Sequence, residues 1–143
     1  METNQLIAAQ LRPILTRLVR KLRKLSPSDN LLSQSERSVM VLLDQQGEMS
    51  SAELAVLEQI TPQSMGQLLN HLAGLDLICK TPSKQDKRKV IISLSKVGIE
   101  KLEKVRSERN EWLSLAISQV CSEKEQKALL EALGPLAKLI DFN

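Results

Sequence analysis

The sequence predicts a mainly α-helical protein with one small β-hairpin, and three observations support this class. Leucines from Leu11 to Leu25 recur at alternating spacings of four and three, which is the pattern of an amphipathic helix. The spacing Ser-x-x-Glu, typical of a helix start, occurs at Ser33, Ser50 and Ser122. Aromatic side chains are nearly absent, so the core must be built from Leu, Ile, Val and Ala, which favours packed helices.

Length and composition indicate one domain. The chain has 143 residues, of which 42% are hydrophobic and 26% charged, and we expect residues 1–143 to form a single domain with a real core. No apolar run approaches the roughly 20 residues of a membrane span, and the start of the chain lacks a secretion signal. We therefore expect a cytoplasmic protein without a membrane partner.

The first three helices can be placed from their ends. The leucine pattern gives a helix over residues 11–25, which Pro27 terminates. Two further helices begin at the Ser33 and Ser50 capping boxes, each with a glutamate three residues later. The first of these two ends at Gly47, because glycine readily takes the conformation that closes a helix.

A helix-turn-helix follows from the next segment. The short helix after Ser50 ends at Glu58, and the following one begins with Thr61 as its cap and Pro62 in its first turn, where no amide donor is needed. Its buried face is expected to consist of Met65, Leu68, Leu69 and Leu72.

The segment after this helix predicts a hairpin. Residues 77–81 and 90–94 read as strands, with Val90, Ile92 and Leu94 on one face, and the polar segment 82–89 joins them. A helix-turn-helix followed by a basic hairpin is a winged helix, whose last helix enters the DNA major groove while the hairpin reaches the neighbouring minor groove.

Two more amphipathic helices are expected over residues 97–120 and 123–141, the second capped by Ser122 and Glu125. Together with residues 1–30 they carry more apolar surface than a winged helix could cover. We therefore assign residues 31–98 to a DNA-binding lobe, and residues 1–30 and 99–143 to a helical lobe that forms a homodimer.

Positive charge is concentrated in the hairpin. The net charge of the chain is +3, but residues 80–96 hold six cations and one acid, which gives +5 there and leaves −2 for the rest. A focused cationic patch on a slightly acidic protein is the pattern expected of a phosphate-backbone binder, although a solvated loop looks similar.

The stretch DKRKVIISLSKVG resembles the wing of the MarR (multiple antibiotic resistance regulator) family of bacterial and archaeal winged helix-turn-helix transcription regulators. The matching positions are Asp86, Arg88, Leu94, Ser95 and Gly98. The order of helices also matches over nearly the whole chain. The resemblance implies a homodimer that binds a palindromic operator in double-stranded DNA and represses a nearby gene until a small-molecule effector or an oxidant intervenes.

The pair Asp86 and Arg88 has two interpretations. In an extended strand the two side chains lie on the same side, so the Asp86 carboxylate can orient the Arg88 guanidinium toward a narrow minor groove. Alternatively, Asp86 is a turn residue and Arg88 a solvated charge. The surrounding wing favours the first interpretation.

The recognition helix departs from the family because residues 54–79 contain no lysine or arginine. Gly66, Gln67 and His71 occupy positions where relatives commonly carry Thr-Arg and a later Arg. Asp76 replaces the glycine that usually ends this helix in the family, and aspartate is among the few residues that tolerate a left-handed conformation there. The amide and hydroxyl side chains of this helix must then read the bases, and the alternative is that they are ordinary solvent-exposed surface. His71 is either a phosphate contact or plain surface. The candidate DNA contacts are Thr61, Gln63, Ser64, Gln67, His71, Lys84, Lys87 and Arg88, with Asp86 orienting Arg88.

No catalytic set, cofactor motif or metal site is evident, since a single histidine has no partner motif and the two cysteines lack ligand spacing. We expect Cys79 and Cys121 to be inert apolar fillers. Two alternatives remain: a regulator that senses oxidants through a cysteine, and a winged-helix module that docks another protein without reading DNA.

The resemblance also implies an effector crevice between the dimerisation helices and the DNA-binding lobe. Ordinary core packing is the alternative explanation of the residues concerned, which are Leu15, Leu18, Met40 and Trp112.

Overall fold

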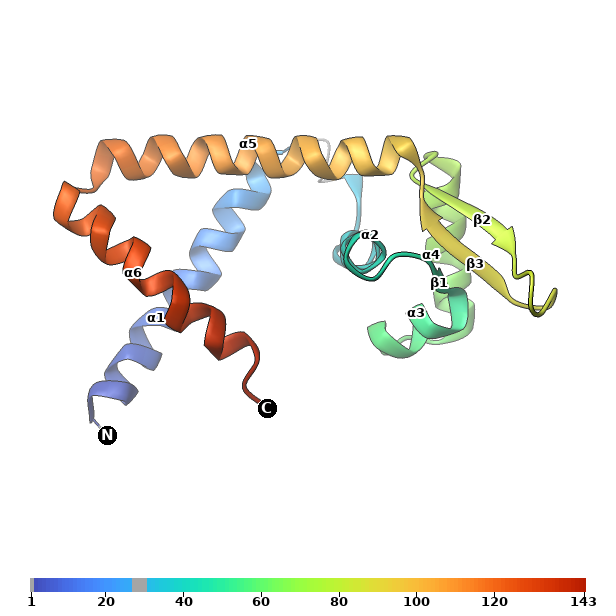
Figure 1. Ribbon diagram of the computed structural model, residues 1–143, viewed down its shortest axis with the longest axis horizontal. Coiled ribbons are helices and arrows are strands. Elements are labelled where there is room, and N and C mark those ends of the chain that lie inside the picture. The colour runs from blue at the N-terminus through green and yellow to red at the C-terminus, as the bar shows by residue number, and fades with distance from the viewer. Residues whose placement is uncertain (1, 27–30) are drawn as a thin grey trace. The chain divides into compact units, whose positions relative to one another are not determined.

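The computed structural model describes residues 2–26 and 31–143 and contains two compact units, Met1–Arg106 and Ser107–Asn143 (Figure 1). The elements in chain order are α1 (Glu2–Lys24), α2 (Gln34–Gln46), β1 (Met49–Ser50), α3 (Ser51–Glu58), α4 (Pro62–Gly74), β2 (Ile78–Pro82), β3 (Val90–Leu94), α5 (Lys96–Val120) and α6 (Glu123–Ile140). The predicted class, mainly α-helical with one small hairpin, is confirmed. Helix α1 begins before the predicted residue 11, and Pro27 lies outside the described residues.

The core of the first unit lies among α2, α3, α4 and the sheet. Its central side chains are apolar and almost fully buried: Val39, Met40, Leu43, Leu54, Ala55, Met65, Leu69, Leu72, Leu77, Ile78 and Ile92. Helix α4 buries three of its four predicted positions, while Leu68 is half-buried against the same cluster. Burying such side chains is the dominant favourable contribution to folding and fixes α4 relative to its neighbours.

Side-chain caps define the helix starts. The boxes at Ser33 with Glu36 and at Ser122 with Glu125 are complete, with reciprocal bonds between side chain and backbone. The capping box predicted at Ser50 has only one of its two side-chain-to-backbone hydrogen bonds. The Ser50 hydroxyl accepts from the Glu53 N–H at 3.1 Å, but the Glu53 carboxylate accepts from that hydroxyl and not from the Ser50 backbone. Ser50 also belongs to strand β1.

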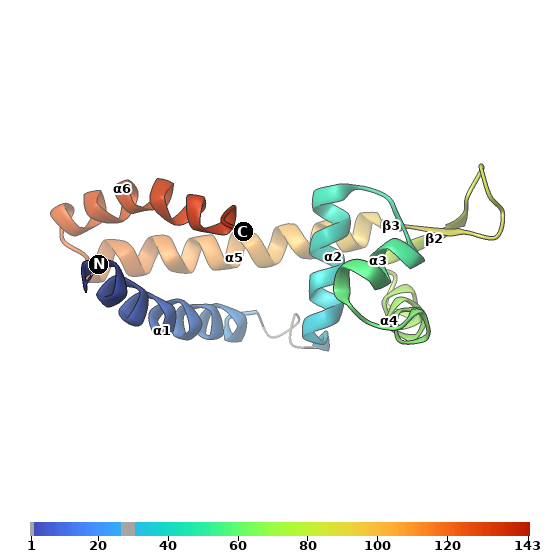
Figure 2. The same ribbon diagram turned by 90° about the horizontal axis from the view of Figure 1, so that it is seen from below.

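The sheet has one strand more than predicted. Strand β3 pairs antiparallel with β2 from Pro82↔Val90 to Ile78↔Leu94, and on its other edge with the two-residue strand β1. Two residues are too few to give an alternating pattern, so β1 left no signal in the sequence. The connection between β2 and β3 projects away from α2, α3 and α4 (Figure 2).

Left-handed residues close both helices of the helix-turn-helix. Asp76 has φ of 60°, as predicted, and Gln59, which follows α3, has φ of 56°. Gly47 after α2 has φ of 76°. These positions turn the chain sharply, so α3 and α4 can pack against the same face of the core.

Helices α1 and α6 have no buried residue within the described chain. Exposed large apolar side chains on them are Leu6, Ile7, Ile14, Leu15 and Val19 of α1, and Leu129, Leu130, Leu133, Leu139 and Ile140 of α6. Across residues 2–26 and 31–143, no helix combines the length and hydropathy needed to cross a membrane.

Candidate nucleic-acid interface

One face of α4 is polar, exposed and without formal charge. Gln63, Ser64, Gln67, Asn70 and His71 are all exposed, and their spacing of three and four residues aligns them along the side opposite the buried face. Amide groups carry both donors and acceptors, so glutamine at such positions can pair with the edge of adenine in a major groove.

The amino-terminal end of α4 is fixed by two of the predicted contact residues. The Thr61 hydroxyl accepts from the Ser64 N–H at 3.1 Å and donates to the Ser64 Oγ at 3.0 Å. Both residues therefore take part in the cap of α4. The Ser64 hydroxyl keeps its own proton as a donor for a ligand.

The connection 83–89 forms a hydrogen-bonded turn. The extended conformation that we predicted for Asp86 and Arg88 is therefore wrong. The Lys89 N–H donates to the Asp86 carbonyl at 3.0 Å, which closes a β-turn. The Asp86 Oδ1 accepts from the backbone N–H of Arg88 at 3.0 Å. Aspartate favours this position because its side chain bonds to the backbone two residues later.

The Arg88 side chain is only loosely held. Its Nε lies 3.8 Å from the Asp86 Oδ1, and the side chain is 96% exposed, against 45% for Asp86. Exposed pairs at this distance contribute little energy. Asp86 therefore fixes the backbone of Arg88 and leaves the guanidinium free for a ligand.

The cations of the wing lie together on this turn. Lys84, Lys87, Arg88 and Lys89 are exposed, and the turn is braced at its base by the Ser83 N–H, which donates to the Lys89 carbonyl at 2.9 Å. The Ser83 hydroxyl also accepts from the N–H groups of Gln85 and Asp86. The patch inferred from the sequence is thus carried by an ordered turn.

Sequence reasoning missed a cation that reaches α4 from the sheet. The Lys80 Nζ of β2 donates to the Asn70 Oδ1 of α4. Lys80 belongs to the basic segment 80–96, but its pairing with the helix depends on packing between two elements and not on sequence spacing. The uncharged recognition helix therefore has a lysine ammonium at its side.

His71 has a buried acidic partner. Its Nδ1 contacts the Oε2 of Glu36, whose side chain is 9% exposed and whose Oε1 accepts from the Ser33 N–H at 2.9 Å. Burial raises the pKa of Glu36, but the hydrogen bonds from Ser33 and His71 together outweigh this effect, and its pKa is lowered. Glu36 is therefore an ionised carboxylate with both oxygens engaged.

The prediction made for the two cysteines requires one correction. Cys79 is exposed, so the prediction that it fills apolar space is wrong for this residue, because β2 buries only Ile78. Cys121 is half-buried. Within the described residues, no three His, Cys, Asp or Glu side chains cluster so as to hold a metal ion.

The four candidate effector residues have different surroundings. Met40 lies in the winged-helix core and is 1% exposed. Leu15 lines a shallow groove of about 400 Å³ on α1 with Thr16, Val19, Arg20 and Arg23, and Leu18 is half-buried. Trp112 is half-buried and belongs to the second unit.

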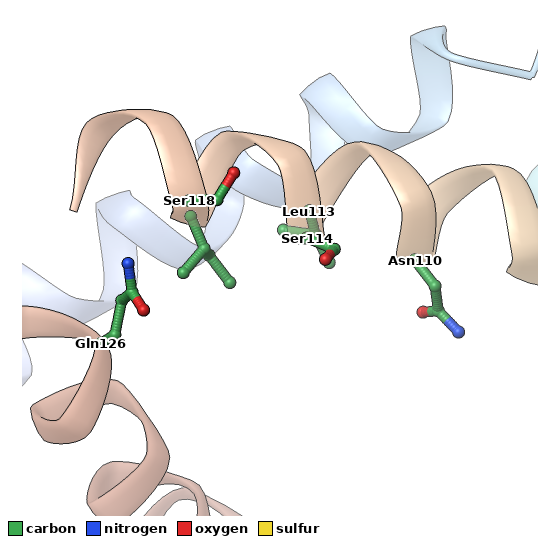
Figure 3. A pocket seen from close by; sticks show the side chains of 6 residues that line it. Asn110, Leu113, Ser114, Ser118 and Gln126 are labelled. Atoms are coloured by element: carbon green, nitrogen blue, oxygen red, sulfur yellow. The ribbon is translucent and has the colours of Figure 1, made fainter. Parts of the chain in front are cut away.

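The second unit has a groove that the sequence did not indicate. It measures about 450 Å³ and is lined by Asn110, Leu113, Ser114, Ile117 and Ser118 of α5 and by Gln126 of α6. Figure 3 shows Gln126 on α6 facing the turns of α5 that carry the other residues. Its lining mixes amides and hydroxyls with two aliphatic side chains.

Comparison with known proteins agrees with the fold. Residues 32–90 match the MarR family. An HTH-type transcriptional regulator of Mycobacterium leprae is 30% identical over 141 residues, which cover 99% of this chain and 97% of that protein. The crystal structure of a transcriptional regulator from Pseudomonas aeruginosa is 31% identical, with a TM-score of 0.84 over 100% of both chains.

A further solved structure is similar in fold alone. It is a variant of S. aureus MepR bound to an oligodeoxyribonucleotide, 22% identical, with a TM-score of 0.71 over 93% of this chain and 96% of that one. These neighbours confirm the predicted class of a winged helix-turn-helix with flanking helices.

Proposed function

Since the chain belongs to the MarR family of HTH-type transcriptional regulators, and so is a DNA-binding regulator and not an enzyme, we propose that it is a repressor that binds a palindromic operator as a homodimer. The observation that carries the proposal is that one compact unit presents both the uncharged polar face of α4 and the cationic turn between β2 and β3. The first suits base edges and the second suits phosphates.

The residues divide between these two tasks. Gln63, Ser64 and Gln67 read base edges in the major groove, and Thr61 holds the amino-terminal end of α4 where its free amides meet the DNA backbone. Lys84 and Lys87 neutralise phosphates, and Arg88 enters the minor groove. The Asp86 carboxylate orients Arg88 through the backbone N–H from which it accepts.

The homodimer is supported by apolar surface that the single chain leaves uncovered. Helix α6 exposes Leu130 to 69% and Leu133 to 59%, and α1 exposes Ile14 to 58%. Apolar faces of this extent mark interaction sites, and a second copy of the chain offers the same faces in a self-complementary arrangement. Two recognition helices then address half-sites about one helical turn apart, roughly 10 base pairs centre to centre.

Release by a small-molecule effector in the cytoplasm completes the proposal. Leu15, Leu18 and Trp112 remain candidates for the effector site, whereas the burial of Met40 in the core favours a purely structural role for it. Sensing through a thiol is a second candidate, favoured by the exposure of Cys79 on β2. If this second candidate is correct, oxidation of the thiol should abolish DNA binding by the wild type and leave binding by Cys79→Ser unchanged.

Footprinting tests the proposed function. The purified protein should protect an inverted repeat in the DNA adjoining its own gene, with two protected half-sites. Protection of one half-site would contradict the homodimer, and no binding of any duplex even at low salt would favour a winged helix that docks another protein.

A further inference from the structure

The pairing of Glu36 with His71 determines which hydrogen bonds the histidine can offer to DNA. An ionised carboxylate only accepts hydrogen bonds, so the His71 Nδ1 that contacts it must carry a proton. In neutral imidazole one nitrogen donates and the other accepts. Neutral His71 therefore presents an acceptor at Nε2, and an acceptor cannot bind a phosphate oxygen.

Protonation reverses this property. When a proton from solvent binds at Nε2, the imidazolium donates at both nitrogens, to Glu36 through Nδ1 and to an external acceptor through Nε2. The His71 side chain is 53% exposed, so an external ligand can reach it. His71 lies in the last turn of α4, whereas base contacts come from the amino-terminal residues of a recognition helix. The acceptor expected at this end is a backbone phosphate.

We propose that Glu36 makes the DNA contact of His71 dependent on protonation, so that this regulator binds DNA more tightly at low pH than at high pH. The inference rests on the proposed function, because it adds a phosphate contact by His71 to the DNA contacts proposed for α4 and the wing. Each His71 takes up one proton when its phosphate contact forms, and no other bond changes.

The other charged groups on elements packed against α4 are bonded to groups other than His71. They are Arg37, bonded to the Leu32 carbonyl; Asp44, paired with Arg106; Glu53 and Glu58, bonded to Ser50 and Ser38; and Lys80, bonded to Asn70. His71 is the only histidine of the chain. A change in affinity between pH 6 and 8 can therefore be assigned to it by substitution.

The decisive variant is Glu36→Gln. Glutamine is accepted at this position of a capping box. Its carbonyl oxygen must accept from the Ser33 N–H, so its amide nitrogen faces the His71 Nδ1 and donates to it. The proton of neutral His71 then moves to Nε2, which donates to phosphate without protonation. The variant should bind DNA at pH 8 more tightly than the wild type.

The experiment measures dissociation constants for operator and random duplexes at pH 6 and pH 8, together with the ¹⁵N shifts of the single imidazole. For the wild type we expect affinity to fall about tenfold or more per contact from pH 6 to pH 8, as suits a charge-assisted bond. For Glu36→Gln and for His71→Arg, the dissociation constant should change less than about threefold between pH 6 and pH 8. Glu125→Gln, which alters the matching capping box of α6, should behave as the wild type.

The spectra give a result that a merely structural role would not produce. Neutral wild-type His71 should be the Nδ1–H tautomer, and Glu36→Gln should convert it to the Nε2–H tautomer. Wild-type binding that is independent of pH, affinity that rises with pH, or a neutral Nε2–H tautomer in the wild type would each overturn the inference. Failure to bind any duplex at pH 6 would instead reject the proposed function and remove this inference with it.

Discussion

Gly98 lies directly against the backbone of Leu77, so closely that a Cβ on Gly98 would stand 2.2 Å from the Leu77 carbonyl oxygen. The same carbonyl accepts from the Ser95 N–H at 3.1 Å, and the Ser95 Oγ accepts from the Gly98 N–H at 2.9 Å. The first turn of α5 is thereby attached to the start of β2. The serine and glycine that end the wing motif have this structural explanation.

Replacing Gly98 with Ala should destabilise the protein by about 1 to 3 kcal/mol, because the added methyl group meets a backbone atom that cannot move aside. Gly66→Ala is the matched control. It also lies inside a helix, a Cβ there meets nothing within 4 Å, and it should be neutral or stabilising by up to about 1 kcal/mol. Chemical denaturation measures both changes, and equal unfolding free energies in the two variants would contradict the packing argument.

Much of the fold could be predicted from local chemistry. Capping boxes at Ser33 and Ser122 and the glycine end at Gly47 are each determined by neighbouring residues, and all three appear as expected. The left-handed Asp76 was expected from the family resemblance and is also present. Strand β1 could not be predicted, because its two residues form a strand only through pairing with β3.

The candidate site shows the same limit. The turn at Asp86 is a local feature, and an aspartate two residues before its backbone donor could have indicated it. The partners Glu36 of His71 and Lys80 of Asn70 lie 35 and 10 residues away in the sequence. Only packing of α4 against α2 and β2 brings these groups together, so no spacing rule could reveal them.

Asp86→Asn tests the orienting role of the wing aspartate. Asparagine keeps the turn preference and removes a negative charge that repels DNA, so simple electrostatics predicts tighter binding. We expect weaker binding, by about 1 kcal/mol, because a neutral amide oxygen holds the Arg88 N–H less firmly than a carboxylate. The double variant with Arg88→Ala should lose little more than Arg88→Ala alone. Tighter binding by a folded Asp86→Asn protein would make Asp86 a turn residue only.

The oligomeric state should be a dimer of twice 16.0 kDa at micromolar concentration. Leu133→Asp places a charge on the apolar face of α6 and should weaken dimerisation on the order of a hundredfold. Leu57→Asp, on the exposed surface of α3, is the control and should leave the mass unchanged. Light scattering that shows a wild-type monomer would reject the two-fold operator as well.

Lys87→Ala should weaken operator and random DNA alike, because Lys87 is an exposed cation on the wing turn. The plot of log affinity against log salt should become less steep by about 0.9 for each phosphate that a subunit no longer neutralises. Lys127→Ala on α6 should leave the slope unchanged. An unchanged slope in Lys87→Ala would mean that this lysine binds no phosphate.

The central claim is that an uncharged face of α4 reads bases while the wing supplies affinity through charge. The most direct measurement is the affinity of Gln67→Ala for the operator and for a random duplex at the same salt concentration. We predict a loss of about 1 to 3 kcal/mol on the operator and almost none on random DNA, as expected for a base-edge contact. Gln46→Ala, an exposed amide at the end of α2, should affect neither. Equal losses on both duplexes, or no loss on either, would contradict the claim that α4 reads sequence through its amides.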